Sequence, residues 1–202
     1  MNEKYGEKFM LIALYPSLII VSLSIILLIF PLVKRRISIL KFIYLLLFII
    51  YICTLIGITI FPFPVQKYFI ETMIEDQLGL KHNFIPFKII YDAMNFGSLS
   101  FGLNILFKQA VGNILLFLPM GFVLPMIFTN IKAIRKVIFI GLLASLSIEL
   151  FQGFAGLWIG YNYRAADIDD LIFNVLGTVI GFFAWKLMYG FLIRNDLIIV
   201  SK

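Results

Sequence analysis

Residues 161–181, with the sequence YNYRAADIDDLIFNVLGTVIG, place several reactive side chains at the start of an apolar stretch. Asp167, Asp170 and Asn174 recur at i, i+3 and i+7, which is the spacing of one helical face. Carboxylates on such a face could transfer protons, attract an amine or hold a divalent cation, and Arg164 could hold a phosphate or a carboxylate. These groups are costly at a membrane boundary, so we expect this stretch to carry a function.

Two other apolar stretches carry polar side chains that fit the same site. Asn113 lies in one of them, while Glu149 and Gln152 lie three residues apart on one face of the other. An intramembrane carboxylate without a partner is energetically expensive, which favours a function for Glu149 and makes Arg164 its expected ion partner. The candidate catalytic residues are Glu149, Arg164 and Asp170, and the candidate ligand-binding residues are Asn113, Gln152, Asp167 and Asn174.

Several of these residues also have a purely structural interpretation. Asp167 and Asp169 stand where carboxylates cap a helix and complement its dipole. Asn113 and Asn174 could form hydrogen bonds between helices. His82 is a lone loop histidine that we expect to be solvated. Two pairs of small residues are expected to pack helices closely, Gly177 with Gly181 and Gly156 with Gly160.

The composition of the 202-residue chain excludes a soluble protein and indicates an integral membrane protein. The chain is 62% hydrophobic and only 14% charged, with a mean hydropathy of +1.04, so its surface could not be covered with polar groups. The formal net charge of +6 therefore marks a membrane face with anionic lipids, and we expect no nucleic-acid partner. Cys53 is the single cysteine, which excludes an intramolecular disulfide and a cysteine-based metal cluster.

Five apolar stretches are each long enough to cross a bilayer, which needs about 20 residues per helix. They run over residues 9–33, 39–61, 104–129, 137–158 and 170–193. We therefore expect an all-α integral membrane helical bundle that forms a single domain over residues 1–202. Basic residues cluster in the first and third connections, around Arg35 and Arg135, so these connections face the cytoplasm. The N-terminus then lies outside the cell membrane, and the C-terminus with Arg194 and Lys202 lies inside.

The long segment 62–103 between the second and third spans is expected to lie outside and to cover the mouth of the bundle. The sequence FPFP (61–64) ends the second span, because proline removes a backbone donor. Apolar residues then recur at helical spacing (Val65, Tyr68, Phe69, Met73), which predicts a short helix in the membrane interface. HNFIPF (82–87) predicts a turn, and NFGSLSFGLN (95–104) predicts a flexible lead-in to the third span.

The expected topology brings the polar groups of three spans to one leaflet. The third and fifth spans run inward and the fourth runs outward, so Asn113, Glu149 and Asp170 lie near the same membrane surface. The sequence thus predicts one outward-facing polar pocket. Its carboxylates outnumber Arg164 and Lys108, so a bare phosphate would need a divalent cation or a protonated carboxylate to bind there.

Four ordered blocks of the chain resemble the VanZ-like family of bacterial membrane proteins: NFIPF, N…LFLPMGFVLP, S…IELFQ and R..DIDDLIFNVLGTVIG. The resemblance covers about residues 83–184. The family is named for a member associated with resistance to the glycopeptide teicoplanin in Gram-positive bacteria. Its characteristic polar positions correspond here to Asn113, Glu149, Gln152, Arg164, Asp167, Asp170 and Asn174. Where Ser or a Gly-Arg pair is common before the acidic block, this chain has YNYRAAD, so contacts just outside the pocket can differ.

Three classes of function follow from the pocket and the resemblance. The first is a pocket that binds a lipid headgroup or a lipid-linked cell-wall precursor and so lowers susceptibility to glycopeptide antibiotics. The second is a membrane-embedded enzyme acting on a lipid-linked or headgroup substrate, with Glu149 as general acid or base. The third is a structural partner of the cell-wall machinery. The sequence has no nucleophile elbow, P-loop or histidine zinc motif, which favours binding over catalysis and leaves the enzyme alternative open.

Overall fold

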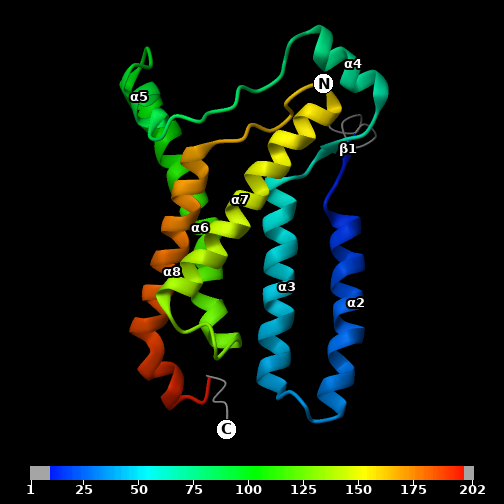
Figure 1. The fold of residues 1–202 in the computed structure, drawn as a ribbon, viewed down its shortest axis with the longest axis vertical. Helices are drawn as coiled ribbons and strands as arrows, with labels where there is room; N and C mark the ends of the chain where they lie inside the picture. The colour runs from blue at the N-terminus through cyan, green and yellow to red at the C-terminus, as the bar shows by residue number, and fades with distance from the viewer. Residues whose placement is uncertain (1–9, 198–202) are drawn as a thin grey trace. The chain divides into compact units, whose positions relative to one another are not determined.

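The computed structural model describes residues 10–197, and nearly all of its regular structure is helical (Figure 1). The elements run in the order β1 (Met10–Leu11), α2 (Leu14–Val33), α3 (Ile39–Thr59), β2 (Phe63–Pro64), α4 (Lys67–Glu75), α5 (Lys88–Met94), α6 (Leu99–Ile127), α7 (Ile134–Ile159) and α8 (Ile168–Arg194). The prediction of an all-α membrane protein is confirmed. Residue 9 of the first predicted span and the terminal Lys202 lie outside the described residues.

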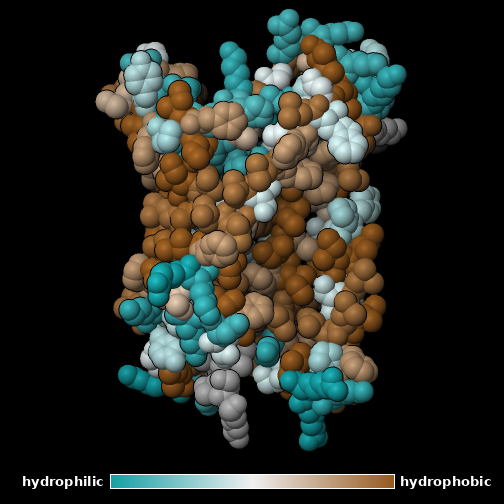
Figure 2. Space-filling view, viewed as in Figure 1, coloured by the Kyte–Doolittle hydropathy of each residue, from teal (hydrophilic) through white to brown (hydrophobic). Residues whose placement is uncertain are grey.

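Helices α2, α3, α6, α7 and α8 are the five in the described chain that are long and apolar enough to cross a membrane. They overlap the five predicted spans, so the number of spans is confirmed. None of the residues of α2 is buried within the protein, which suits a helix that faces lipid. Figure 2 shows apolar side chains in brown along the spans and polar ones in teal toward their ends. Which end faces the cytoplasm stays a prediction.

The described chain divides into two compact units. The N-terminal unit comprises residues 10–81 and 152–164, and the C-terminal unit comprises residues 82–151 and 165–197. The boundaries between the units fall between α4 and α5 at residues 81 and 82, inside α7, and between α7 and α8. The single domain predicted for the whole chain stays a prediction.

In the N-terminal unit, α2 packs against α3. The strands that precede α2 and follow α3 pair in antiparallel register, with Met10 opposite Pro64. Ser38 caps the start of α3, because its side chain accepts a hydrogen bond from the backbone nitrogen of Lys41 at 3.1 Å. At its other end α3 stops at Thr59, just before the FPFP sequence, as predicted.

In the C-terminal unit, α6 and α8 pack closely because glycines lie at their contact. A Cβ atom on Gly177 would lie 2.2 Å from the carbonyl oxygen of Ile114, and one on Gly181 would lie 2.0 Å from that of Leu118. No larger side chain fits at such distances, so the predicted packing role of both glycines is confirmed.

The other predicted packing pair, Gly156 and Gly160, has a different role, and that prediction is wrong. Gly160 follows the last residue of α7 and adopts a φ of 91°, in the left-handed region. A Cβ atom on Gly156 would lie 2.2 Å from Oδ1 of Asn162. Both glycines therefore allow the chain to turn tightly after α7.

The segment between α3 and α6 is more regular than predicted. The expected short helix exists as α4, although its place in the membrane interface stays a prediction. The turn predicted for residues 82–87 is present, with Lys88 N bonded to Ile85 O at 3.2 Å. The flexible lead-in predicted for residues 95–104 is wrong over most of its length, because α6 already begins at Leu99.

Helix α5 was not predicted, and its packing explains why the start of α6 is ordered. A Cβ atom on Gly102 of α6 would lie 2.2 Å from the carbonyl oxygen of Ala93 in α5. The two backbones therefore meet directly at the first turns of α6, which holds this region in a helical conformation.

Candidate functional site

Four carboxylates gather at the start of α8 in the C-terminal unit, and we call Glu149, Asp167, Asp169 and Asp170 the carboxylate cluster. Asp167 is the N-cap residue of α8, with extended φ and ψ of −133° and 121°, and its Oδ1 accepts from Asp169 N at 2.8 Å. Asp169 and Asp170 occupy the first turn, where negative charge is favoured by the helix dipole. The capping interpretation of Asp167 is thus confirmed.

Asp170 is held by two amide side chains of α6. Its Oδ1 accepts a hydrogen bond from Gln109 Nε2 at 2.9 Å and another from Asn113 Nδ2 at 2.5 Å. The two amides lie one helical turn apart on α6, so they can reach the same carboxylate. Asn113 and Asp170 were predicted to meet, and Gln109 was missed although it stands four residues before Asn113.

Asp169 is fully buried and binds the segment that leads into α5. Its two carboxylate oxygens accept from the backbone nitrogens of Phe87 at 2.5 Å and Ile89 at 3.0 Å. Asn83 donates to Asp169 at 3.3 Å and to Asp167 at 2.8 Å. Asp169 therefore does more than complement the dipole of α8, because it also binds the first backbone N–H groups of a second helix. Asn83 opens the NFIPF block, which was the available sequence signal for its role.

The same segment also pairs with the chain just before α8. Asn83 N donates to Ala166 O, and Ile168 N donates to Asn83 O, each at 2.9 Å. His82 Nδ1 accepts from Ala166 N at 2.9 Å, and its ring stacks on Phe84. The expectation of a merely solvated His82 is wrong, because this ring nitrogen satisfies a backbone donor.

Glu149 reaches the cluster from α7. Its side chain is buried, with 8% exposed, and Oε2 accepts a hydrogen bond from Asp167 N at 2.7 Å. The ion pair expected between Glu149 and Arg164 would join the two units, and it stays a prediction. The ion pair found in the described part of the C-terminal unit joins Lys88 and Asp92, which are not members of the carboxylate cluster. The hydrogen bonds to the cluster therefore come from neutral donors.

Asn174 takes part in a separate contact between α7 and α8. Its Nδ2 donates to Ser145 Oγ at 2.9 Å, and both residues are buried. Thr178 in turn donates its hydroxyl to Asn174 O at 3.1 Å. The interhelical interpretation of Asn174 is confirmed, and Ser145 was missed although it stands four residues before Glu149 on the same face.

Gln152 and Arg164 belong to the N-terminal unit, where they bind the end of α3. Gln152 Nε2 donates to Thr59 O at 2.9 Å, while Arg164 Nη2 donates to Phe61 O at 2.6 Å and to Ile58 O at 3.2 Å. The last carbonyl groups of a helix lack partners within it, and a positive charge there complements the helix dipole. These two side chains therefore form a cap on α3.

Tyr163 completes this cap by donating its hydroxyl to Ile60 O at 3.1 Å. Burial raises the pKa of Tyr163 to about 12, and the charge of Arg164 opposes part of that rise. The phenol therefore remains a hydrogen-bond donor to a higher pH than an ordinary tyrosine does.

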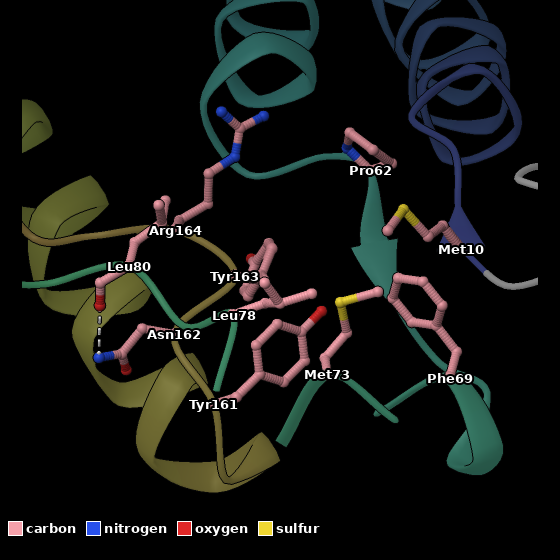
Figure 3. Close-up of a pocket in the computed structure, with 10 residues that line it drawn as sticks. All are labelled: Met10, Pro62, Phe69, Met73, Leu78, Leu80, Tyr161, Asn162, Tyr163 and Arg164. Carbon is pink, nitrogen blue, oxygen red and sulfur yellow. Dashed lines mark hydrogen bonds between the residues drawn. The ribbon is translucent and has the colours of Figure 1, made fainter. Parts of the chain in front are cut away.

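A cavity of about 300 Å³ opens beside this cap in the N-terminal unit, and we call it the Arg164 cavity (Figure 3). It is lined by Met10, Pro62, Phe69, Met73, Leu78, Leu80, Tyr161, Asn162, Tyr163 and Arg164. Arg164 carries the one charge among these lining residues, and Figure 3 shows its side chain extended toward the chain that leaves α3. The cavity thus combines an apolar and aromatic lining with a single cation.

Two hydrogen bonds join lining residues of the Arg164 cavity that come from different segments of the chain. Asn162 Nδ2 donates to Leu80 O at 3.0 Å, and Leu80 N donates to Asn162 O at 2.8 Å. The turn after α7 is therefore held against the chain that follows α4.

Among residues 10–197, no three or more His, Cys, Asp or Glu side chains are grouped so that they could hold a metal ion.

The comparison with protein families decides the family of the chain. The family model described as VanZ/LLP1 matches residues 48–189, which is well over half of the chain. The chain belongs to the VanZ/LLP1 family. The VanZ-like region runs from the middle of α3 into α8 and includes every predicted site residue in both units. Among curated proteins and among solved structures, none matches the chain.

Proposed function

We propose that this VanZ-like membrane protein binds an amphiphile in the Arg164 cavity, either a lipid headgroup or a lipid-linked cell-wall precursor. The observation that carries this proposal is a cavity of about 300 Å³ whose apolar lining contains one guanidinium. Ligand pockets are mostly apolar and hold a few polar groups that fix the orientation of the ligand. The family supports the second part of the proposal, that binding lowers susceptibility to glycopeptide antibiotics such as teicoplanin.

Charge and hydrogen bonding favour an anionic headgroup. Arg164 uses Nη2 for the carbonyl oxygens of Ile58 in α3 and of Phe61 just after it, and its other guanidinium nitrogens have no hydrogen-bond partner within the described chain. An arginine fork suits a phosphate or a carboxylate, and no acidic residue among the lining residues would repel one. The carboxylate cluster, by contrast, already receives its hydrogen bonds from Gln109, Asn113 and backbone N–H groups.

The size of the cavity limits how much of the ligand it can enclose. Its volume of about 300 Å³ is at the lower end of ligand pockets, which suits a headgroup and the first atoms of its chains rather than a whole lipid. The basic loops predict that this end of the protein faces outward. A ligand would then come from the outer leaflet, where a glycopeptide meets its target.

Lipid binding tests this proposal directly. Purified protein would be mixed with equal amounts of phosphatidylglycerol and phosphatidylcholine, and retained lipid would be measured by native mass spectrometry. We expect preferential retention of the anionic lipid and protection of a glycopeptide-sensitive Gram-positive host that expresses the protein. Equal retention of both lipids would contradict an arginine-based headgroup site, and unchanged antibiotic sensitivity would contradict the resistance role.

An enzyme acting on a lipid-linked or headgroup substrate is the second proposal, and Glu149 supports it. This carboxylate is buried, and only Oε2 has a hydrogen-bond partner within the described chain. Its other oxygen could give or take a proton from a substrate. Asp170 is less suited to proton transfer, because Gln109 and Asn113 already bind it.

Glu149→Gln separates catalysis from structure. The amide oxygen can still accept from Asp167 N, so abundance and thermal stability should stay close to wild type while turnover and protection are lost. Gly181→Leu is the packing control and should lose protein as well as protection, because its side chain would overlap the backbone of α6. Full protection by Glu149→Gln at normal abundance would exclude the catalytic role.

A further inference from the structure

The segment that leads into α5 exposes most of its large apolar side chains. Phe84 is 73% exposed and Tyr91 is 69% exposed. Five further apolar residues between 84 and 96 are also exposed: Ile85, Phe87, Ile90, Met94 and Phe96. An exposed apolar surface of this extent indicates an interaction site rather than a surface that faces water.

Several backbone N–H groups at the start of this segment donate hydrogen bonds within the protein. Phe87 N and Ile89 N donate to the fully buried carboxylate of Asp169, and Ile85 N donates to Asn83 Oδ1 at 3.1 Å. A loop in water could leave such donors to the solvent, whereas non-helical backbone at membrane depth must find partners within the protein. Internal backbone partners together with outward apolar side chains are what a lipid-facing segment requires.

The charges of α5 do not oppose contact with lipid. Lys88 Nζ lies 2.5 Å from Asp92 Oδ2 on the same helix, so the two charges form an ion pair one turn apart. Pairing lowers the cost of bringing both groups to a membrane interface, and the long lysine stem can keep its ammonium among the headgroups.

The apolar surface continues onto a membrane span. Helix α5 packs on the first turns of α6, where the backbones of Ala93 and Gly102 meet (Figure 1). On α6 itself, Leu99, Leu103 and Phe107 are exposed at intervals of four residues, so they lie on one side of a helix long enough to span the membrane. The lipid that covers this side of α6 is therefore the nearest partner for the exposed side chains of α5.

We propose that residues 84–96 insert into the bilayer at the boundary of headgroups and acyl chains, with the carboxylate of Asp169 anchoring their backbone to α8. The segment is an interfacial anchor beside the first turns of α6, and its partner is lipid hydrocarbon. This inference does not depend on the ligand of the Arg164 cavity, because every residue in it belongs to the C-terminal unit.

Site-directed fluorescence tests the insertion in the full-length protein. Phe84→Cys and Tyr91→Cys, each in a Cys53→Ser background, would carry an environment-sensitive dye in phosphatidylcholine vesicles. Leu103→Cys on α6 is the lipid-facing control, and Asn130→Cys in the exposed loop after α6 is the aqueous control. We expect the dyes at Phe84 and Tyr91 to resemble that at Leu103, with emission shifted to the blue and quenching by brominated lipid.

Two quenching results would contradict insertion of residues 84–96 into the bilayer. Quenching by aqueous iodide at Phe84 and Tyr91, as at Asn130, would show that the segment lies in water and would overturn the proposal. Protection from both quenchers would show that protein covers the segment, for example a second copy of the chain, and would overturn it too.

A second comparison tests the role of Asp169. Asp169→Leu in the labelled Phe84→Cys protein removes the acceptor for Phe87 N and Ile89 N, so we expect the dye to become more accessible to iodide. Asp169→Asn keeps one acceptor oxygen and should give a smaller change. Unchanged quenching in a folded Asp169→Leu protein would contradict the anchoring role, while the test of insertion uses the unaltered anchor and stands by itself.

Discussion

Arg164 donates a hydrogen bond from Nη2 to the carbonyl oxygen of Phe61 over 2.6 Å. The same nitrogen reaches Ile58 O at 3.2 Å, so one side chain both caps α3 and carries the charge of the cavity. A residue chosen from the sequence for its affinity for anions thus has a structural role as well. Any experiment on Arg164 must separate its role in the cap from its role in binding.

The cap gives the first prediction. Arg164→Gln should lower the free energy of unfolding by about 1.5–3 kcal/mol, because hydrogen bonds from a charged donor are lost at the end of α3. The measurement is reversible unfolding in detergent micelles. Arg135→Gln is the matched control, since Arg135 is exposed and should change stability little. Equal effects of the two substitutions would exclude a specific cap.

The second prediction concerns Asp170 and Asn113. Each single change to alanine should destabilise the protein by about 1–3 kcal/mol, because the half-buried partner loses its hydrogen bond. The double variant should lose less than the sum, with a coupling energy of about 0.5–3 kcal/mol for groups in contact. Additive losses in this double-mutant cycle would contradict the hydrogen bond between them.

The third prediction follows from the pKa of Tyr163, which lies at about 12 in the folded protein against 10.0 for an ordinary tyrosine. A raised folded pKa favours the protonated form, so this residue contributes stability that is complete below pH 10 and is lost as the pH rises to about 12. The stability difference between wild type and Tyr163→Phe should therefore shrink over that window. A difference independent of pH up to 12 would contradict burial of the phenol.

The fourth prediction concerns topology. Cysteines at Ser98 and Asn162, introduced singly in a Cys53→Ser background, should react with an impermeant thiol reagent on intact cells, whereas one at Asn130 should not. The basic residues around Arg135 are the reason, because they favour the cytoplasmic face. Labelling at Asn130 alone would reverse the orientation and place the Arg164 cavity on the cytoplasmic side.

Periodicity and charge were sufficient to predict the spans and part of the site. Asn113 and Asp170 could be brought together because helical spacing and the number of spans fix which groups share a leaflet. The partners of Glu149 and Arg164 could not be predicted in the same way. Both side chains bind backbone groups: Glu149 accepts from Asp167 N, and Arg164 donates to the carbonyl oxygens at and just after the end of α3. Such groups have no residue-type signature.

The irregular regions were also predicted less well, because they too depend on contacts between residues that are far apart in the sequence. Helix α5 has only seven residues, and it is held by the buried carboxylate of Asp169, which lies far away in the sequence. Its stability depends on tertiary contacts that local propensity does not contain. Gly156 and Gly160 were mistaken for a helix-packing pair, because spacing alone cannot show that α7 ends just before Gly160.

Binding of an anionic amphiphile in the Arg164 cavity is tested most directly by filling the cavity while leaving the cap on α3 intact. Met73→Trp places a large ring among the lining residues and leaves Arg164 itself unaltered, whereas Met188→Trp makes the same change on an exposed part of α8. We predict that Met73→Trp weakens binding of phosphatidylglycerol by at least about tenfold, or about 1.4 kcal/mol, and that Met188→Trp binds like wild type. Wild-type affinity in a folded Met73→Trp protein would contradict the cavity as the binding site.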